Sequence, residues 1–162
     1  MMFWAIFSLF NCPQLLLGRK KIGFNKAEYE GQTALIYAAT NGQDRIVQLL
    51  LGKRFIEVNA AEMWGNTALI WAARNGHEKV VRLLLGREET QAGAVCNGGW
   101  TALMFAAGKG YEKIVQLLLE RDDVDVNAAN HDGETALMRA ADEGHLTVAR
   151  GGLAAGSLSS IS

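Results

Sequence analysis

Apolar and polar residues recur along the chain with a period of 34 residues. The clearest copy runs from Gly65 to Leu85 and reads G-N-T-A-L-I-W-A-A-R-N-G-H-E-K-V-V-R-L-L-L. Related copies begin at Gly31, at Gly99 and, more loosely, at Gly133. A fixed period in this range is typical of a solenoid, in which each unit contacts only its neighbours along the stack.

Each copy of the pattern predicts two short helices. Thr67 is a natural N-cap for a helix over about Ala68–Asn75, and Gly76 can take the positive φ that ends this helix. A second helix over about Glu78–Leu85 is too apolar to remain in contact with water. Isolated helices become marginally stable only near ~12 to 15 residues, so neighbouring units must stack to bury these shorter ones.

One face of each first helix is predicted to form the core. Leu69, Ala72 and Ala73 are spaced i, i+3 and i+4, which places them on a single helical face. Because alanine is small, it allows adjoining helices to approach closely. The equivalent residues in the neighbouring copies are Leu35, Ala38, Ala39, Leu103, Ala106 and Ala107.

The shared pattern T-A-L-x-x-A-A-x-x-G-H-x-x-V-V-x-L-L-L, followed by Val58-Asn59-Ala60 or Val126-Asn127-Ala128, resembles the ankyrin repeat over roughly residues 15 to 148. The resemblance implies an all-α fold, an ankyrin-repeat solenoid of stacked helix-turn-helix units joined by β-turn or hairpin-like loops. These loops would project as fingers beside the first helices. Residues such as Ala68 and Ile70 stand where the family has proline and histidine, so we expect apolar contact at the second of these positions.

The period predicts one domain over residues 1–150. Residues 1–30 fit a degenerate capping repeat, residues 31–64, 65–98 and 99–132 fit full repeats, and residues 133–150 fit an incomplete last repeat. Gly151 and Gly152 replace periodic leucines, so we expect fraying beyond about Arg150 and a flexible tail over residues 151–162. The apolar run Met1–Phe10 could instead be a signal or an anchor, but it lacks a basic n-region and is too short to span a bilayer.

Net charge and cysteine content indicate which partners and which cellular compartment to expect. A formal net charge of −1 gives no general electrostatic reason to expect nucleic acid or an anionic membrane as the partner. Cys12 and Cys96 lie in unrelated contexts, which favours free thiols in a reducing compartment. We therefore expect a cytoplasmic protein, with the nucleus as the alternative.

The sequence contains no arrangement typical of catalysis. It has no Gly-rich phosphate loop after a strand, no Ser or Cys set beside a His, and no spacing suited to a metal. We expect no enzymatic activity, no cofactor and no metal. His77 and His145, which follow helix-ending glycines, are interpreted as local capping groups, and the adjacent Asp142 and Glu143 as part of a solvated rim.

A candidate binding surface follows from helix geometry. With ~100° per residue, Trp71, Arg74 and Asn75 point away from the core side of the first helix. Successive repeats then place Tyr37, Trp71 and Phe105 in a row on the outward side of the first helices. Lys109 and Arg139 occupy outward positions of the later repeats.

The resemblance extends this surface onto the fingers. The family's variable contact positions correspond here to Tyr29, Glu30, Gln32, Met63, Trp64, Asn66, Asn97, Gly98, Trp100, His131, Asp132 and Glu134. Trp64 and Trp100 are the strongest candidates, because turns favour polar residues and exposed indoles are common anchors at interfaces. The alternative is that these rings, and those of the aromatic row, pack flat between repeats and stabilise the stack.

The resulting hypothesis is a non-catalytic protein-protein interaction module that binds a protein or peptide on the concave face formed by the fingers and first helices. Arg74 and Lys109 lie at the centre of this face and acidic residues at its ends, which favours a partner with an apolar centre and basic flanks. One alternative is a nucleotide or RNA binder, and another is an architectural segment of a larger assembly. We expect a monomer, with self-association through the apolar N-terminus as a further alternative.

Overall fold

The computed structural model describes Asn25, Ala27 and residues 29–153 of the chain. The predicted capping repeat over residues 1–30 therefore lies almost wholly outside the described residues. So do residues 154–162 of the predicted tail.

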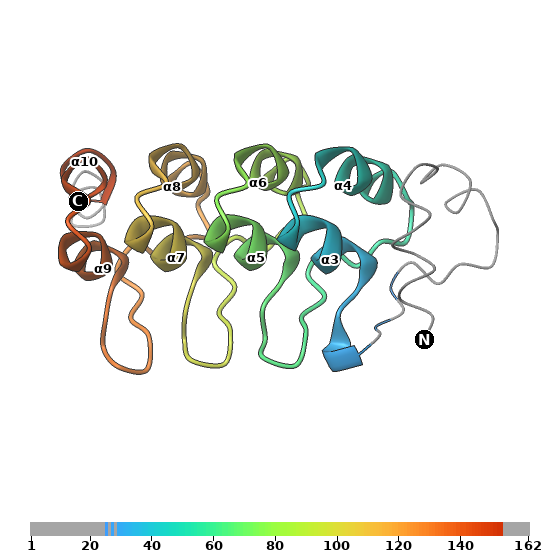
Figure 1. Ribbon diagram of the computed structural model, residues 1–162, viewed down its shortest axis with the longest axis horizontal. Coiled ribbons are helices and arrows are strands. Elements are labelled where there is room, and N and C mark those ends of the chain that lie inside the picture. Colours follow the sequence, from blue (N-terminus) through green and yellow to red (C-terminus); the bar gives the residue numbers. More distant parts are fainter. Residues whose placement is uncertain (1–24, 26, 28, 154–162) are drawn as a thin grey trace.

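Helix pairs follow one another through the described residues (Figure 1). The first helices are α3 (Ala34–Thr40), α5 (Ala68–Arg74), α7 (Ala102–Gly108) and α9 (Ala136–Asp142). The second helices are α4 (Asp44–Leu51), α6 (Glu78–Leu85), α8 (Glu112–Leu119) and α10 (Leu146–Val148), which continues as the π-helical segment η2 (Ala149–Leu153). A short 3₁₀ turn, η1 (Tyr29–Gly31), precedes α3.

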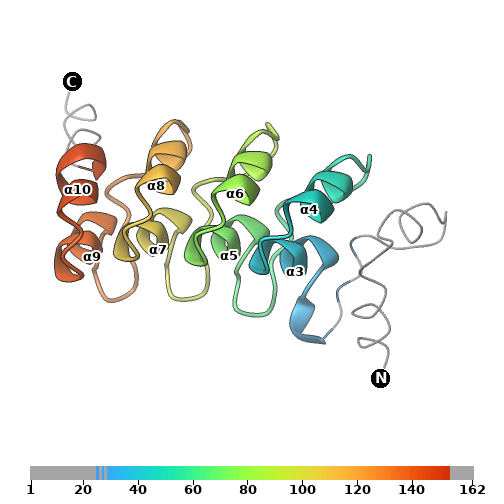
Figure 2. The same ribbon diagram turned by 45° about the horizontal axis from the view of Figure 1, so that its top comes forward.

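The helices form two parallel rows, as Figures 1 and 2 show from two directions. The first helices form one row and the second helices the other. The predicted all-α solenoid is confirmed, because each pair packs against the pair before it and the pair after it. The predicted bounds of α5 and α6 are correct to within one residue.

The helix ends follow the chemistry expected from the sequence. The Thr67 hydroxyl accepts a hydrogen bond from the N–H of Ile70, and the other N-cap threonines do the same in their repeats. Gly76 has φ +78°, a conformation that residues with a Cβ rarely adopt, and it lets the chain turn sharply into α6.

The core runs along the stack between the two rows. The predicted leucine and alanine face of the first helices is buried in the inner repeats, as are Ile36, Ile70 and Met104. These last three residues occupy the place where the family pattern has histidine. The expected apolar contact at this position is therefore confirmed in those repeats.

Fingers project beside the row of first helices (Figure 1). We use this name for the hairpin-like loops that are closed by bridges from Ala61 to Thr67, from Val95 to Thr101 and from Ala129 to Thr135. Neighbouring fingers are joined by backbone hydrogen bonds, in which Asn97 N–H donates to the Trp64 carbonyl and His131 N–H donates to the Gly98 carbonyl. The fingers thus form a continuous surface rather than independent loops.

The last repeat departs from the prediction. Fraying was expected after Arg150, but the chain stays helical to Leu153 through the π-helical turn. Buried Val148 anchors this segment, and η2 packs against both α8 and α9. Tertiary packing offsets the low helix propensity of the two glycines in this turn.

Candidate functional site

Three aromatic rings and two arginines form a continuous stack across α5, α7 and α9. The guanidinium carbon of Arg74 lies 5.2 Å from the ring centroid of Trp71 and 5.1 Å from that of Phe105. Phe105 stacks on Trp100, with 5.2 Å between centroids and 19° between planes. The Arg139 guanidinium covers the Trp100 ring at 5.4 Å. We call these five residues the aromatic ladder.

The ladder connects repeats as well as presenting a surface. The rings of Trp71 and Phe105 were predicted to face away from the core, but both are half-buried and pack against its edge. An arginine over an aromatic face contributes about 0.5–1 kcal/mol when exposed and about 2 kcal/mol when desolvated. Part of the predicted aromatic row therefore stabilises the stack.

Arg139 lies at the acidic end of this surface. Its guanidinium contacts the carboxylates of Glu134 and Asp142 at 3.7 Å and that of Glu143 at 3.4 Å. Its side chain is mostly buried, so the three carboxylates surround a cation with little access to solvent. The negative charge predicted for this end is thus partly neutralised by the protein itself.

Trp64 is the most accessible indole of the predicted surface. Trp64 is 46% exposed and the adjacent Met63 is 57% exposed, both at the turn of a finger. Trp100, in contrast, is half-buried within the ladder. The two tryptophans, which the sequence analysis treated alike, therefore have different environments.

A buried carboxylate holds the turn that carries Trp64. Glu62 is only 4% exposed, and it accepts hydrogen bonds from the backbone N–H groups of Trp64 and Asn66 at 3.1 and 3.0 Å. The Asn66 side-chain amide donates a third bond at 2.6 Å. Glu62 was not among the residues predicted from the sequence. Its equivalence with Asn130, two 34-residue periods later, which holds its own turn in a similar way, could have indicated it.

The other predicted contact residues divide by exposure. Asn66 is buried and bonded to Glu62, which corrects its prediction as a contact residue, because its side chain cannot reach a partner on this surface. Residues that are exposed are Arg74, Asn75, Asn97, Lys109, His131 and Asp132. Residues that are half-buried are Glu30, Gln32, Tyr37, Gly98, Glu134 and Arg139. Tyr29 lies in η1, and its side chain is outside the described part.

The predicted role of His77 as a local cap is wrong. His77 occupies the N-cap position of α6, but its side chain makes no capping bond there. Its Nε2 atom lies 3.0 Å from the Thr40 carbonyl of the preceding repeat, which also accepts from the Asn75 amide at 2.9 Å. The imidazole therefore joins two repeats instead of capping its own helix.

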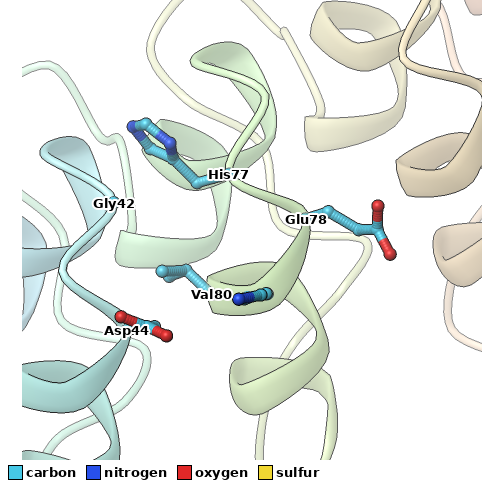
Figure 3. Close-up of a pocket in the computed structure, with 6 residues that line it drawn as sticks. Gly42, Asp44, His77, Glu78 and Val80 are labelled. Atoms are coloured by element: carbon cyan, nitrogen blue, oxygen red, sulfur yellow. The ribbon is translucent and has the colours of Figure 1, made fainter.

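A hollow lies beside His77. It is open to solvent and is lined by Gly42, Asp44, His77, Glu78, Lys79 and Val80 (Figure 3). The carboxylate of Glu78 points away from Asp44, toward the next repeat. The two carboxylates that line the hollow therefore do not face each other.

The described part of the chain carries neither a metal-binding cluster nor a membrane-spanning helix. No group of three or more His, Cys, Asp or Glu side chains there is arranged to hold a metal ion. None of the helices described has the length and apolar character needed to cross a membrane.

Comparison with known proteins gives one family match. The family model described as ankyrin repeats, in three copies, matches residues 1–94 and 88–151 of the chain. The match includes the leading residues that precede the described array. A search of curated proteins found no match.

Proposed function

The chain belongs to the ankyrin repeat family, and from this premise we propose that it is a non-catalytic interaction module whose protein or peptide partner binds across the finger face. By finger face we mean the finger turns together with the outward side of the first helices. Ankyrin repeats generally mediate protein–protein interactions and are typically non-catalytic.

The observation that carries the proposal is the exposed pair Met63 and Trp64 on a rigid turn. The buried Glu62 carboxylate fixes this turn through its three hydrogen bonds. A partner would therefore meet a turn whose backbone is already ordered, which lowers the entropy cost of binding. Tryptophan side chains in such positions often dominate the binding energy of an interface.

The surroundings of Trp64 support a partner with an apolar centre and basic flanks. Toward the middle of the array, the ladder supplies a half-buried aromatic floor beside the exposed cations Arg74 and Lys109. At the far end, Asp132 and the carboxylates around Arg139 are acidic. An apolar side chain of the partner would contact Trp64, and a basic residue would lie at this acidic end.

A nucleotide or RNA ligand gains no support from the aromatic ladder. Stacking of a base requires an open aromatic or guanidinium face. Arg74 already bridges two rings, and Trp100 is covered by Phe105 and Arg139. We also propose a cytoplasmic or nuclear location, because Cys96 is a free thiol.

The experiment compares Trp64→Ala with the intact chain as bait in a quantitative pull-down. Proteins enriched by the intact chain should be lost or reduced at least about tenfold with Trp64→Ala, as expected for an anchor worth about 2 kcal/mol. Phe55→Ala is the matched control, since Phe55 is 78% exposed but lies on the loop after α4 rather than on a finger turn.

Circular dichroism of both variants separates binding from folding. Both should retain the helical content and unfolding midpoint of the intact chain. If Trp64→Ala stays folded and captures the same proteins as the intact chain, the finger face is not the binding surface.

A further inference from the structure

Arg74 carries a charge that no carboxylate in the described part of the chain neutralises. Its guanidinium carbon lies 5.2 Å from the ring centroid of Trp71 and 5.1 Å from that of Phe105. Among the described residues, no carboxylate lies within ion-pair distance of this guanidinium and no acceptor takes a hydrogen bond from it. Since Arg74 is also exposed, the two rings hold its guanidinium in place and leave its N–H donors to solvent.

The second arginine of the aromatic ladder shows what a guanidinium in this setting binds. Arg139 lies over the ring of Trp100 at 5.4 Å, and it also contacts three carboxylates of its own repeat at 3.4 to 3.7 Å. Both contacts form at once because a ring covers a face of the planar guanidinium, whereas the N–H donors lie in the plane. The chain supplies carboxylates to Arg139 and none to Arg74.

The sequence explains why Arg74 has no carboxylate beside it. Its equivalents in the two neighbouring repeats are Thr40 and Gly108, neither of which is acidic. The Thr40 hydroxyl donates to the Ile36 carbonyl of its own helix. Gly108 is covered by the next repeat, since an added Cβ there would lie 3.6 Å from the Nε atom of Arg139. The repeats on both sides of Arg74 therefore leave its charge unmatched.

Lys109 adds a second cation at the same level of the array. Arg74 is the last residue of α5 and Lys109 is the C-cap of α7, so both lie at the C-terminal ends of adjacent first helices (Figure 1). The negative end of a helix dipole stabilises a cation there. Lys109 is exposed, and no carboxylate of the described residues pairs with it. The middle of the finger face is therefore positive.

We infer that this positive centre binds the carboxylate of an aspartate or glutamate side chain of the partner, with Arg74 as the main contact and Lys109 beside it. The inference rests on the proposed function, because it adds one polar contact to the face that Trp64 anchors. A guanidinium and a carboxylate form two parallel charge-assisted hydrogen bonds, which give both strength and a defined orientation. The rings already restrict the Arg74 side chain, so ordering it on binding costs little.

The position of Arg74 relative to Trp64 sets the spacing of groups in the partner. Trp64 lies on the finger that leads into α5, and Arg74 lies at the far end of this helix. The seven residues of α5 span about 10 Å. An extended peptide would thus need at least about three residues between the apolar side chain on Trp64 and the acidic side chain on Arg74. A partner that is only basic would not fit.

Selection from a library of random peptides displayed on phage tests the inference, with the intact chain as the target. The enriched peptides should share an apolar residue and an acidic residue at least about three positions apart. Affinities of synthetic copies are then measured by fluorescence polarisation. Arg74→Gln should weaken binding by at least about tenfold, because the partner's carboxylate would lose its charged donor.

Charge reversal separates direct contact from a structural role of Arg74. The same selection on Arg74→Glu should enrich lysine or arginine in place of the acidic residue. A peptide with lysine at that position should bind Arg74→Glu more tightly than it binds the intact chain. Loss of packing on the rings alone would not change which charge is selected.

Arg54→Gln is the matched control. Arg54 is also exposed and lies over an aromatic ring, that of Phe55 at 5.6 Å, but it belongs to the loop after α4 rather than to the finger face. This variant should leave the affinities unchanged. Circular dichroism should give the same helical content for all variants compared.

The outcomes distinguish this inference from the proposed function. Peptides that lose binding with Trp64→Ala but not with Arg74→Gln overturn the inference and leave the finger face as the binding surface. Peptides that are unaffected by either variant refute both. The inference is also wrong if the intact chain enriches no peptide, or if the enriched peptides share no acidic residue.

Discussion

The imidazole Nε2 of His77 lies 3.0 Å from the carbonyl oxygen of Thr40, one repeat earlier in the chain. Since a carbonyl oxygen only accepts hydrogen bonds, Nε2 must carry the proton. The ring also lies against the backbone of Gly42, so the start of α6 is fixed to the end of α3 by both a hydrogen bond and packing. Tyr111 and His145 lie over Gly76 and Gly110 in the same way in later repeats.

The first prediction concerns this contact between repeats. His77→Ala should lower the free energy of unfolding by about 1–2 kcal/mol, since the variant loses one hydrogen bond and the packing of the ring. His77→Tyr should lose less, because Tyr111 already fills the equivalent place over Gly76. Urea unfolding followed by circular dichroism measures both values. Equal losses in the two variants would show that ring packing contributes little.

The second prediction uses two glycines with nearly the same backbone. Gly42 has φ +66° and Gly144 has φ +75°, so alanine at either site pays a similar conformational cost of about 1–2 kcal/mol. Only Gly42 has a neighbour, the His77 ring, 2.6 Å from an added Cβ. Gly42→Ala should therefore be less stable than Gly144→Ala by about 1 kcal/mol or more, as measured by urea unfolding. Two equal values would contradict the close packing of His77.

The periodic part of the structure could be predicted from the sequence because the same signals recur in each repeat. The apolar spacing, the N-cap threonines and the helix-ending glycines all give local signals of helix start, face and end. These signals directly predicted the bounds of α5 and α6 and the burial of Leu69. Such signals depend on residues within one turn of each other.

The site was predicted less completely, because its geometry depends on contacts between repeats. Helix angles indicated that Trp71 and Phe105 share a side, but not that Arg74 would lie between their rings. Nor could they show that His77 bonds across the repeat boundary. Glu62 was missed because two of its three partners are backbone N–H groups, whose positions residue type alone does not reveal.

The third prediction tests the turn that presents Trp64. Glu62→Ala should lower the free energy of unfolding by about 2 kcal/mol or more, because the part-buried N–H of Trp64 and the buried N–H of Asn66 would lose their acceptor. Glu62→Asn should be milder, since Asn130 holds the turn of the last finger through equivalent bonds to backbone N–H groups. Its amide could also donate to the Asn66 Oδ1 atom, which has no hydrogen-bond partner in the described part.

Tryptophan fluorescence and urea unfolding measure the effects of these two variants. The emission of Trp64 should change with Glu62→Ala more than with Glu62→Asn. If both variants unfold at the midpoint of the intact chain, the carboxylate does not hold the turn.

The fourth prediction concerns stability in acid. Burial acts to raise the pKa of Asp123, but the backbone N–H of Ala92 and the Arg121 guanidinium outweigh it and hold the pKa below its ordinary value of 3.8. A carboxyl with a lowered folded pKa adds stability above its unfolded pKa and loses it as pH falls through the folded pKa. Asp123 should therefore contribute to acid sensitivity below about pH 4.

Urea unfolding at several pH values down to the acid limit checks this effect. The contribution should be only a few tenths of a kcal/mol, because the side chain is 42% exposed and solvent screens the pair. Asp123→Asn keeps an acceptor for Ala92 but cannot titrate, so its stability should fall less steeply in acid. A steeper fall than that of the intact chain would have the wrong sign.

The fifth prediction separates the two finger tryptophans. Trp100 lies between Phe105 and Arg139 in the aromatic ladder, whereas Trp64 is 46% exposed. Trp100→Ala should lower the free energy of unfolding by about 1–3 kcal/mol, because it removes a ring stack, a cation–π contact and part of the core edge. Trp64→Ala should change it by less than about 0.5 kcal/mol. The order of these two losses follows from the surroundings of the two rings, since the residue type and the substitution are the same.

Urea unfolding measures both losses. It is followed by circular dichroism, because each substitution removes a tryptophan and so changes the fluorescence signal. If Trp64→Ala proved the more damaging variant, the exposed indole would be a structural part of its finger, and the partner surface would have to be sought on the exposed cations Arg74 and Lys109 instead.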